Sequence, residues 1–157
     1  MRHAKSAWDS DAPTDHERPL APRGRRDAPR MARWLQARGW TPDAVVSSDA
    51  TRAHQTAALL VAAWAPAPPV HLAPVLYGAG LGALRGQAAT WDPAWQTVLA
   101  LGHDPGWSAA VEALCGQPVE LKTAACALLE GGGRTWAEAL QGPWRLVALQ
   151  APRGLPD

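Results

Sequence analysis

The sequence predicts an α/β fold of three layers, in which helices cover both faces of a mostly parallel sheet. Two observations predict this class. Short apolar runs alternate with segments whose apolar residues recur at helical spacing, and the chain has no internal repeat. A length of 157 residues suits one compact domain, and an apolar fraction of 47% is enough to build its core. We therefore expect residues 1–157 to form a single domain.

The first half of the chain alternates helix and strand. We expect a helix over Pro22–Arg38, ended by Gly39, because its apolar residues repeat every three or four positions. The apolar run Ala44–Ser47 predicts a short buried strand. A second helix should follow over Ala50–Trp64, where the proline-rich run Pro66–Pro69 ends it. The apolar residues of the first helix are Ala28, Met31, Ala32 and Leu35.

The second half continues this alternation. Thr97–Leu101 is a continuous apolar run that ends at Gly102, which is typical of a buried parallel strand. The same reasoning predicts further strands over Val70–Leu72, Thr123–Glu130 and Arg145–Leu149, and helices over Leu81–Ala89 and Gly106–Leu114.

Composition excludes several classes of protein. Fifteen Lys and Arg residues against fourteen Asp and Glu give a net charge of +1, which argues against a nucleic-acid partner. No apolar run reaches the ~18 residues of a membrane span, and the start has no apolar leader segment. Cys115 and Cys126 have no metal or redox spacing and suit buried thiols in a reducing compartment. We expect a cytoplasmic protein that binds neither nucleic acid nor membrane.

Unusual side chains stand where predicted strands begin or end. Arg2 and His3 open the chain, Arg52 lies one turn into the helix after Ala44–Ser47, and His103 follows the strand that ends at Gly102. In open α/β sheets ligands bind at the carboxyl ends of strands. Arginines hold phosphoryl oxygens, and a neutral imidazole can attack phosphorus. A lone histidine after a strand is more often structural, so the spacing of these residues alone does not establish a phosphoryl-binding site.

The sequence segments around these residues resemble those of a known family. Arg2–Ser6, Asp15–Leu20 and Arg23–Ala28 closely resemble the opening of the SixA-like phosphohistidine phosphatases, of the histidine phosphatase (phosphoglycerate mutase-like) superfamily. Ser47–Ala57 resembles the family's second block, and Leu101–Gly106 resembles its third. The blocks stand in the family's order, and the resemblance extends over nearly the whole chain.

The resemblance implies roles for five residues. His3 would be the nucleophile that is phosphorylated transiently, and Arg2 and Arg52 would bind the phosphoryl oxygens. His103 would donate to those oxygens in the transition state, and Arg18 would be a further phosphate ligand. It implies no metal and no other cofactor, because the arginines supply the electrostatic stabilisation.

The first departure from the family concerns the nucleophile's own strand. In the family an apolar strand runs directly into the Arg-His pair, whereas this chain begins at Met1. The two interpretations are that Met1 is an internal residue of that strand and the assigned start is too late, or that the strand is lacking. In the second case His3 loses part of its support.

The second departure concerns the proton donor. Mutases and broad phosphomonoesterases of the superfamily carry an acid after the second block, but no Asp or Glu occurs over residues 50–91. An alkoxide leaving group needs a proton, whereas the N–P bond of phosphohistidine needs less help. Asp104 and Glu17 remain alternative donors.

We therefore predict a phosphatase that acts on phosphohistidine in a protein, for which a histidine-phosphotransfer domain is one candidate. The alternatives are a phosphomonoesterase of small phosphorylated molecules and a phosphate-binding module without turnover. Two nearby residues stay open at this point. Tyr77 suits the pocket floor and the core equally, and His16 is interpreted as a solvated loop residue.

Overall fold

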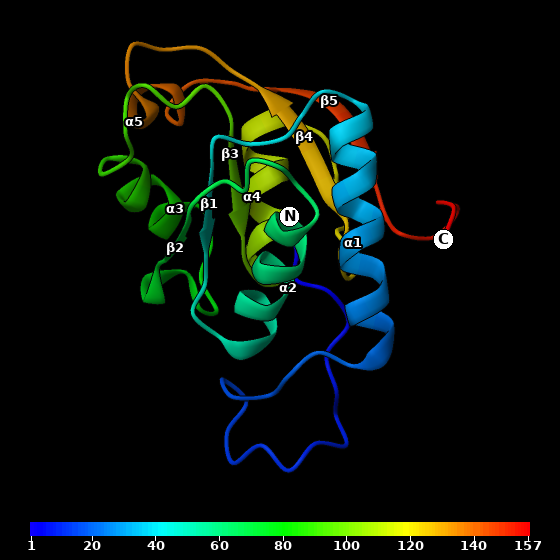
Figure 1. The fold of residues 1–157 in the computed structure, drawn as a ribbon. Helices are drawn as coiled ribbons and strands as arrows, with labels where there is room; N and C mark the ends of the chain where they lie inside the picture. Colours follow the sequence, from blue (N-terminus) through cyan, green and yellow to red (C-terminus); the bar gives the residue numbers. More distant parts are fainter.

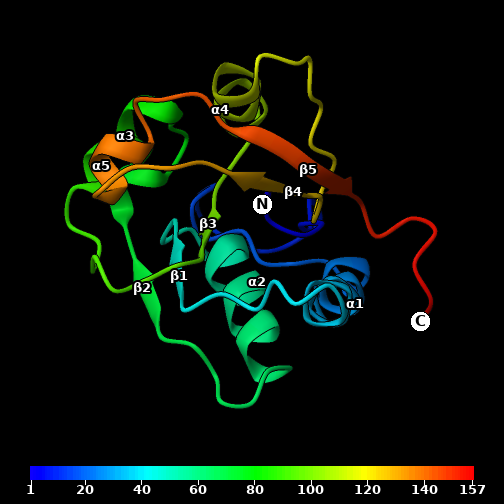
Figure 2. The same ribbon diagram turned by 90° about the horizontal axis from the view of Figure 1, so that it is seen from above.

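The computed structural model describes residues 1–157 and contains a central sheet between two layers of helices (Figures 1 and 2). Three strands run parallel in the order β2-β1-β3. In this sheet Val45 is paired with Val70 on one side and with Leu99 on the other. The remaining pair, β4 and β5, is antiparallel, with a bulge between Leu128 and Leu129. The strands are β1 (Ala44–Ser47), β2 (Val70–Leu72), β3 (Val98–Leu101), β4 (Cys126–Glu130) and β5 (Arg145–Gln150).

The first three residues lie between β3 and the start of β4. Gly102 donates its N–H to the carbonyl of Met1 at 3.1 Å, and His3 donates to the carbonyl of Gly102 at 3.1 Å. On the other side, Ala124 donates to the carbonyl of His3 at 2.9 Å. Residues 1–3 thus occupy the position expected for the nucleophile's strand. Beyond Met1, a groove of about 680 Å³ lies between β3 and β4.

Helices cover the sheet on both faces. Helices α1 (Pro22–Ala37) and α2 (Thr51–Ala62) lie on one face, and α3 (Leu81–Ala88) and α4 (Gly106–Cys115) lie on the other (Figure 2). The core divides accordingly. Met31 and Leu60 belong to a buried cluster on the first face, and Leu84 and Val111 belong to one on the second. The short helix η1 (Pro74–Leu76) and the single-turn α5 (Trp136–Ala139) complete the set.

The predicted fold class is confirmed, with differences at the carboxyl end of the chain. β4 begins at Cys126 rather than Thr123, because Ala124 has a left-handed φ of 62° that interrupts the extended backbone. The single turn of α5 is too short to show a helical period in the sequence. No helix has both the length and the apolar character that crossing a bilayer requires.

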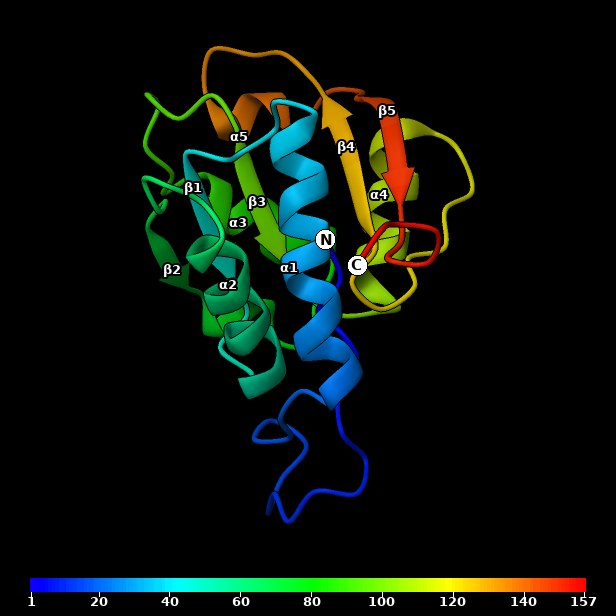
Figure 3. The same cartoon turned by 45° about the vertical axis from the view of Figure 1, so that its right-hand side comes forward.

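One long loop leaves the body of the molecule. Residues 7–19 project from the end of the sheet at which β3 finishes (dark blue at the bottom of Figures 1 and 3). The base of the loop is closed by an antiparallel bridge between Ser6 and Leu20. Gly24 is essential to this closure, since a Cβ there would lie 2.2 Å from the carbonyl oxygen of Lys5. The loop therefore stands over the ends of the strands.

Candidate active site

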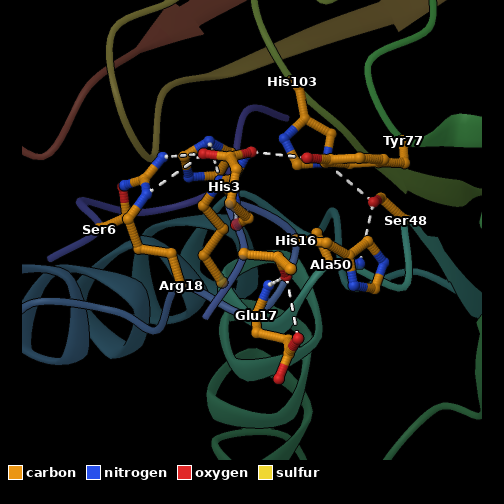
Figure 4. A network of polar contacts seen from close by, with 12 residues as sticks. His3, Ser6, His16, Glu17, Arg18, Ser48, Ala50, Tyr77 and His103 are labelled. Carbon is orange, nitrogen blue, oxygen red and sulfur yellow. Dashed lines mark hydrogen bonds and ion pairs between the residues drawn. The ribbon is translucent and has the colours of Figure 1, made fainter. Parts of the chain in front are cut away.

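The structure brings the predicted site residues together at one end of the sheet. His3 follows the bridge between Arg2 and Gly102, and His103 comes directly after that glycine on the neighbouring strand. Arg52 is the second residue of α2, whose start follows β1. Figure 4 shows His3, Arg18 and His103 directed at one place. The ring centroids of the two histidines are 5.1 Å apart.

His3 is held as a neutral imidazole with its proton on Nδ1 and its lone pair on Nε2. It is 6% exposed, and its Nδ1 lies 2.7 Å from the carbonyl oxygen of Ala4. A carbonyl oxygen only accepts, so Nδ1 carries the proton and Nε2 keeps its lone pair. Arg52 Nε donates to this Nε2 at 3.3 Å. The pKa of His3 is lowered to about 3, by burial above all and then by the neighbouring His103, Arg52 and Arg2, against the bond to the Ala4 carbonyl, which raises it.

His103 is also neutral at physiological pH and has one nitrogen without a partner. Its pKa is lowered to about 4, by burial first and then by Arg52. Its Nε2 lies 2.8 Å from Ser48 Oγ, and its buried Nδ1 has no hydrogen-bond partner. Ser48 Oγ accepts from the N–H of Ala50 at 3.2 Å and can donate its hydroxyl proton to His103 Nε2. When Nε2 accepts from Ser48, the ring proton of His103 lies on Nδ1, which can then donate a hydrogen bond to a group bound in the site.

Three guanidinium groups surround the histidines. The side chains of Arg52 and Arg18 are 7% and 10% exposed, which fixes both groups in the wall of the site. Arg18 also donates to Ser6 Oγ. Arg2 donates from Nη1 to the carbonyl of Leu121 at 3.0 Å, and its buried Nε has no partner. The site therefore presents several N–H donors and an excess of positive charge.

The structure adds Asp15 and Tyr77, which the sequence did not assign to the site. Asp15 Oδ2 accepts from Arg52 Nη2 at 3.0 Å and from the Tyr77 hydroxyl at 2.6 Å, while Oδ1 accepts from Arg18 Nη2 at 3.0 Å. The Tyr77 bond, followed by the two arginines, holds the pKa of Asp15 well below its usual range. The same bond raises the pKa of Tyr77. Spacing would have given one signal, since Asp15 stands three residues before Arg18.

Tyr77 belongs to the site rather than to the core. The residue is 38% exposed, and its ring meets His103 edge-on with centroids 5.3 Å apart. It also meets the ring of His16 edge-on. His16 is a partly exposed loop residue, as expected, and its Nε2 also lies 2.9 Å from Asp49 Oδ1.

The two alternative proton donors are engaged elsewhere. Asp104 accepts from the hydroxyl of Ser108 at 2.8 Å and lies 3.9 Å from Arg2 Nη1. Glu17 is exposed and accepts from Thr14 Oγ1 at 3.0 Å. No group of three His, Cys, Asp or Glu side chains is placed so that it could hold a metal ion. What the site offers is a neutral imidazole lone pair beside fixed cationic donors, which suits an anionic tetrahedral group.

Comparison with known proteins agrees with this geometry. Residues 1–118 match the histidine phosphatase superfamily (branch 1). An uncharacterized chloroplast protein of Arabidopsis thaliana is 38% identical over 97% of this chain and 76% of its own length. The SixA structure from Nakamurella multipartitia superposes with a TM-score of 0.83 at 29% identity, over 98% of this chain and 94% of that one. A structure of the protein histidine phosphatase SixA complexed with tungstate gives 0.81 at 25% identity, over 97% and 94%.

Proposed function

This chain belongs to the histidine phosphatase superfamily, and from that membership we propose that it is a metal-independent phosphatase with His3 as its nucleophile. Its proposed substrate is phosphohistidine in a protein. One observation carries the proposal more than any other. His3 is buried and neutral, its Nδ1–H is bound to a carbonyl, and its Nε2 lone pair lies beside Arg52. That is the state an attacking imidazole needs.

The first step transfers the phosphoryl group to the protein. Arg52 Nε transfers its hydrogen bond from His3 Nε2 to a phosphoryl oxygen. The freed lone pair of Nε2 forms a bond to phosphorus as the bond from phosphorus to the substrate's imidazole nitrogen breaks. That nitrogen leaves with the electron pair, and the substrate's imidazole takes its proton from solvent. Arg2, Arg18 and Arg52 bind the phosphoryl oxygens, and His103 Nδ1–H donates to them as charge develops.

The second step returns the protein to its starting state. Water attacks phosphorus, the P–Nε2 bond breaks, and orthophosphate leaves with the oxygen and one proton of that water. The electron pair returns to Nε2, and the other proton goes to solvent. Because burial keeps the pKa of His3 near 3, the imidazole is regenerated in its neutral form.

The choice of phosphohistidine rests on the missing acid. General acid catalysis contributes typically ~10²–10⁴-fold to a rate, and an alkoxide leaving group depends on it. No carboxylic acid lies over residues 50–91, and the Tyr77 proton is bound to Asp15, which raises the pKa of the phenol. The imidazole of phosphohistidine can take a proton from water on its second ring nitrogen before the N–P bond breaks, so it leaves as a neutral group without an acid in the site. A substrate with an N–P bond therefore suits this site better than a phosphate ester.

The test is release of orthophosphate from a protein phosphorylated on histidine, in the presence of a chelator. We expect turnover by the unmodified chain and by His54→Gln, because His54 is exposed on α2 and makes no side-chain hydrogen bond. We expect none from His3→Gln. During turnover, the unmodified chain should yield a phosphoenzyme that is labile in acid and absent from His3→Gln.

Three results would contradict the proposal. Faster turnover of sugar phosphates or nucleotides would identify a small-molecule phosphomonoesterase. Binding of orthophosphate or vanadate without a phosphoenzyme at His3 would identify a binding module without turnover. Loss of activity in the chelator, restored by a divalent cation, would contradict metal independence.

A further inference from the structure

Asp15 occupies the donors that a phosphoryl group needs. Its carboxylate accepts from Arg52 Nη2 at 3.0 Å, from Arg18 Nη2 at 3.0 Å and from Arg18 Nε at 3.3 Å. The hydroxyl of Tyr77 donates to the same group at 2.6 Å. A carboxylate held by two arginines and one hydroxyl resembles a bound phosphoryl group in both charge and contacts.

We propose that Asp15 is an internal competitor for the phosphoryl-binding arginines, which its carboxylate must release before an anion can bind. The inference rests on the part of the proposed function that assigns phosphoryl oxygens to Arg18 and Arg52. The inference goes beyond that assignment, because the competing carboxylate would set the affinity of the site for anions. The competitor weakens the binding of every anion, orthophosphate included, and so favours product release.

The two sides of this contact differ in how firmly they are held. The side chains of Arg18 and Arg52 are nearly buried, whereas that of Asp15 is 49% exposed and lies on the projecting loop. Arg18 also donates to Ser6, and Arg52 also donates to His3 and to the main-chain carbonyl of Asp15, so neither guanidinium depends on the carboxylate alone for its position. Displacement therefore moves Asp15 into solvent and leaves the arginines in place.

The backbone around Asp15 is anchored independently of its carboxylate. Arg52 Nη1 donates to the main-chain carbonyl of Asp15 at 2.7 Å, and Thr51 donates its N–H to the carbonyl of His16 at 2.9 Å. The His16 side chain is paired with Asp49. These contacts hold the loop against α2, so rotation of one side chain is enough to open the site.

Charge explains why the carboxylate is placed there. Without an anion, Arg18 and Arg52 would face one another and two buried imidazoles with no negative charge between them. The pKa of Asp15 is held below its usual range by Tyr77 and both arginines, so the competitor is ionised throughout the neutral and mildly acidic range in which binding is measured. The competition is therefore a constant property of the site and not a pH switch.

Binding of orthophosphate, measured by titration calorimetry at fixed ionic strength, tests the inference without requiring turnover. Asp15→Asn keeps the shape of the side chain and removes its charge. We expect it to bind orthophosphate roughly tenfold more tightly than the unmodified chain, the scale set by loss of a charged hydrogen-bond acceptor. Asp11→Asn is the matched control, because Asp11 is an exposed carboxylate of the same loop whose side chain makes no hydrogen bond or ion pair. Its affinity should be unchanged.

The opposite results would overturn the inference. Equal or weaker binding by Asp15→Asn would mean that Asp15 positions the arginines instead of competing for them. Equal tightening by Asp11→Asn would mean that the effect is only one of overall charge. Asp15→Ser is a second, shorter variant to be measured if the amide distorts the loop, and it should also bind more tightly. If Asp15→Asn binds more tightly but no form of the chain releases phosphate, the competitor is real and the proposed turnover is wrong.

Discussion

The two neutral histidines should make the fold sensitive to acid well above the pH at which they themselves titrate. The pKa of His3 is about 3 in the folded chain, against 6.5 for an ordinary histidine. Between these values the unfolded chain binds a proton that the folded chain does not, so the free energy of unfolding falls as pH is lowered through this window. Each pH unit below 6.5 removes about 1.4 kcal/mol, so moving from pH 7 to pH 5 removes ~2 kcal/mol through His3.

The measurement is urea unfolding at pH 7 and at pH 5 for the unmodified chain and His3→Gln. The variant has no imidazole at this position, so it should lose ~2 kcal/mol less than the unmodified chain over the same interval. His54→Gln removes an exposed histidine and should keep the full loss. Only the change with pH is compared, so any constant effect of a substitution on stability cancels.

One outcome would refute the reasoning directly. If His3→Gln and the unmodified chain lose the same free energy of unfolding between pH 7 and pH 5, folding does not lower the pKa of His3. The same physics predicts that activity persists down to pH 5 while stability declines, because His3, the proposed nucleophile, stays unprotonated far below the ordinary pKa of a histidine. A fall in kcat/KM with its midpoint near pH 6.5 would contradict this prediction as well.

Three further substitutions test the site and its support. Arg52→Lys should lower kcat/KM about 10²-fold in steady-state assays, because an ammonium cannot make the several directed bonds of a guanidinium. Trp8→Ala removes the ring that lies 3.6 Å from the Arg18 guanidinium, so KM should rise about two- to fivefold with kcat kept. Gly106→Ala should lower the free energy of unfolding by about 2 kcal/mol or more in urea titration, since its Cβ would stand 2.0 Å from the carbonyl oxygen of Ala79.

The parallel part of the fold could be predicted because each element has a strong local signal. β1 and β2 have the predicted bounds, and α1 ends within one residue of the expected position. Apolar residues at helical spacing and continuous apolar runs can be recognised in a single sequence, because a buried helix face or strand requires apolar side chains at those positions. The end of β4 nearest the site was misplaced, since the turn at Ala124 depends on its pairing with His3 and has no local signal.

Only those residues of the candidate site that lie in recognisable sequence motifs could be predicted. His3, Arg52 and His103 stand in the three blocks that resemble the family, and the structure brings them within one cluster. Asp15 lies in the first of those blocks but was not assigned, because a carboxylate in a polar loop is usually solvated. Tyr77 lies outside every block and reaches the site only because η1 turns the chain after β2. Contacts of this kind depend on the tertiary path of the chain.

The burial that keeps His3 neutral also explains why a carboxylate stands in the site. Burial and cationic neighbours keep both imidazoles neutral, so they contribute no charge of their own. The arginines remain charged at any pH and need a counter-ion when no phosphoryl group is bound. A buried carboxylate would satisfy them permanently and block the reaction, whereas a half-exposed one on an anchored loop satisfies them reversibly. Exposure of Asp15 beside burial of its two arginine partners is therefore what allows one pocket to be stable without a substrate and open to one.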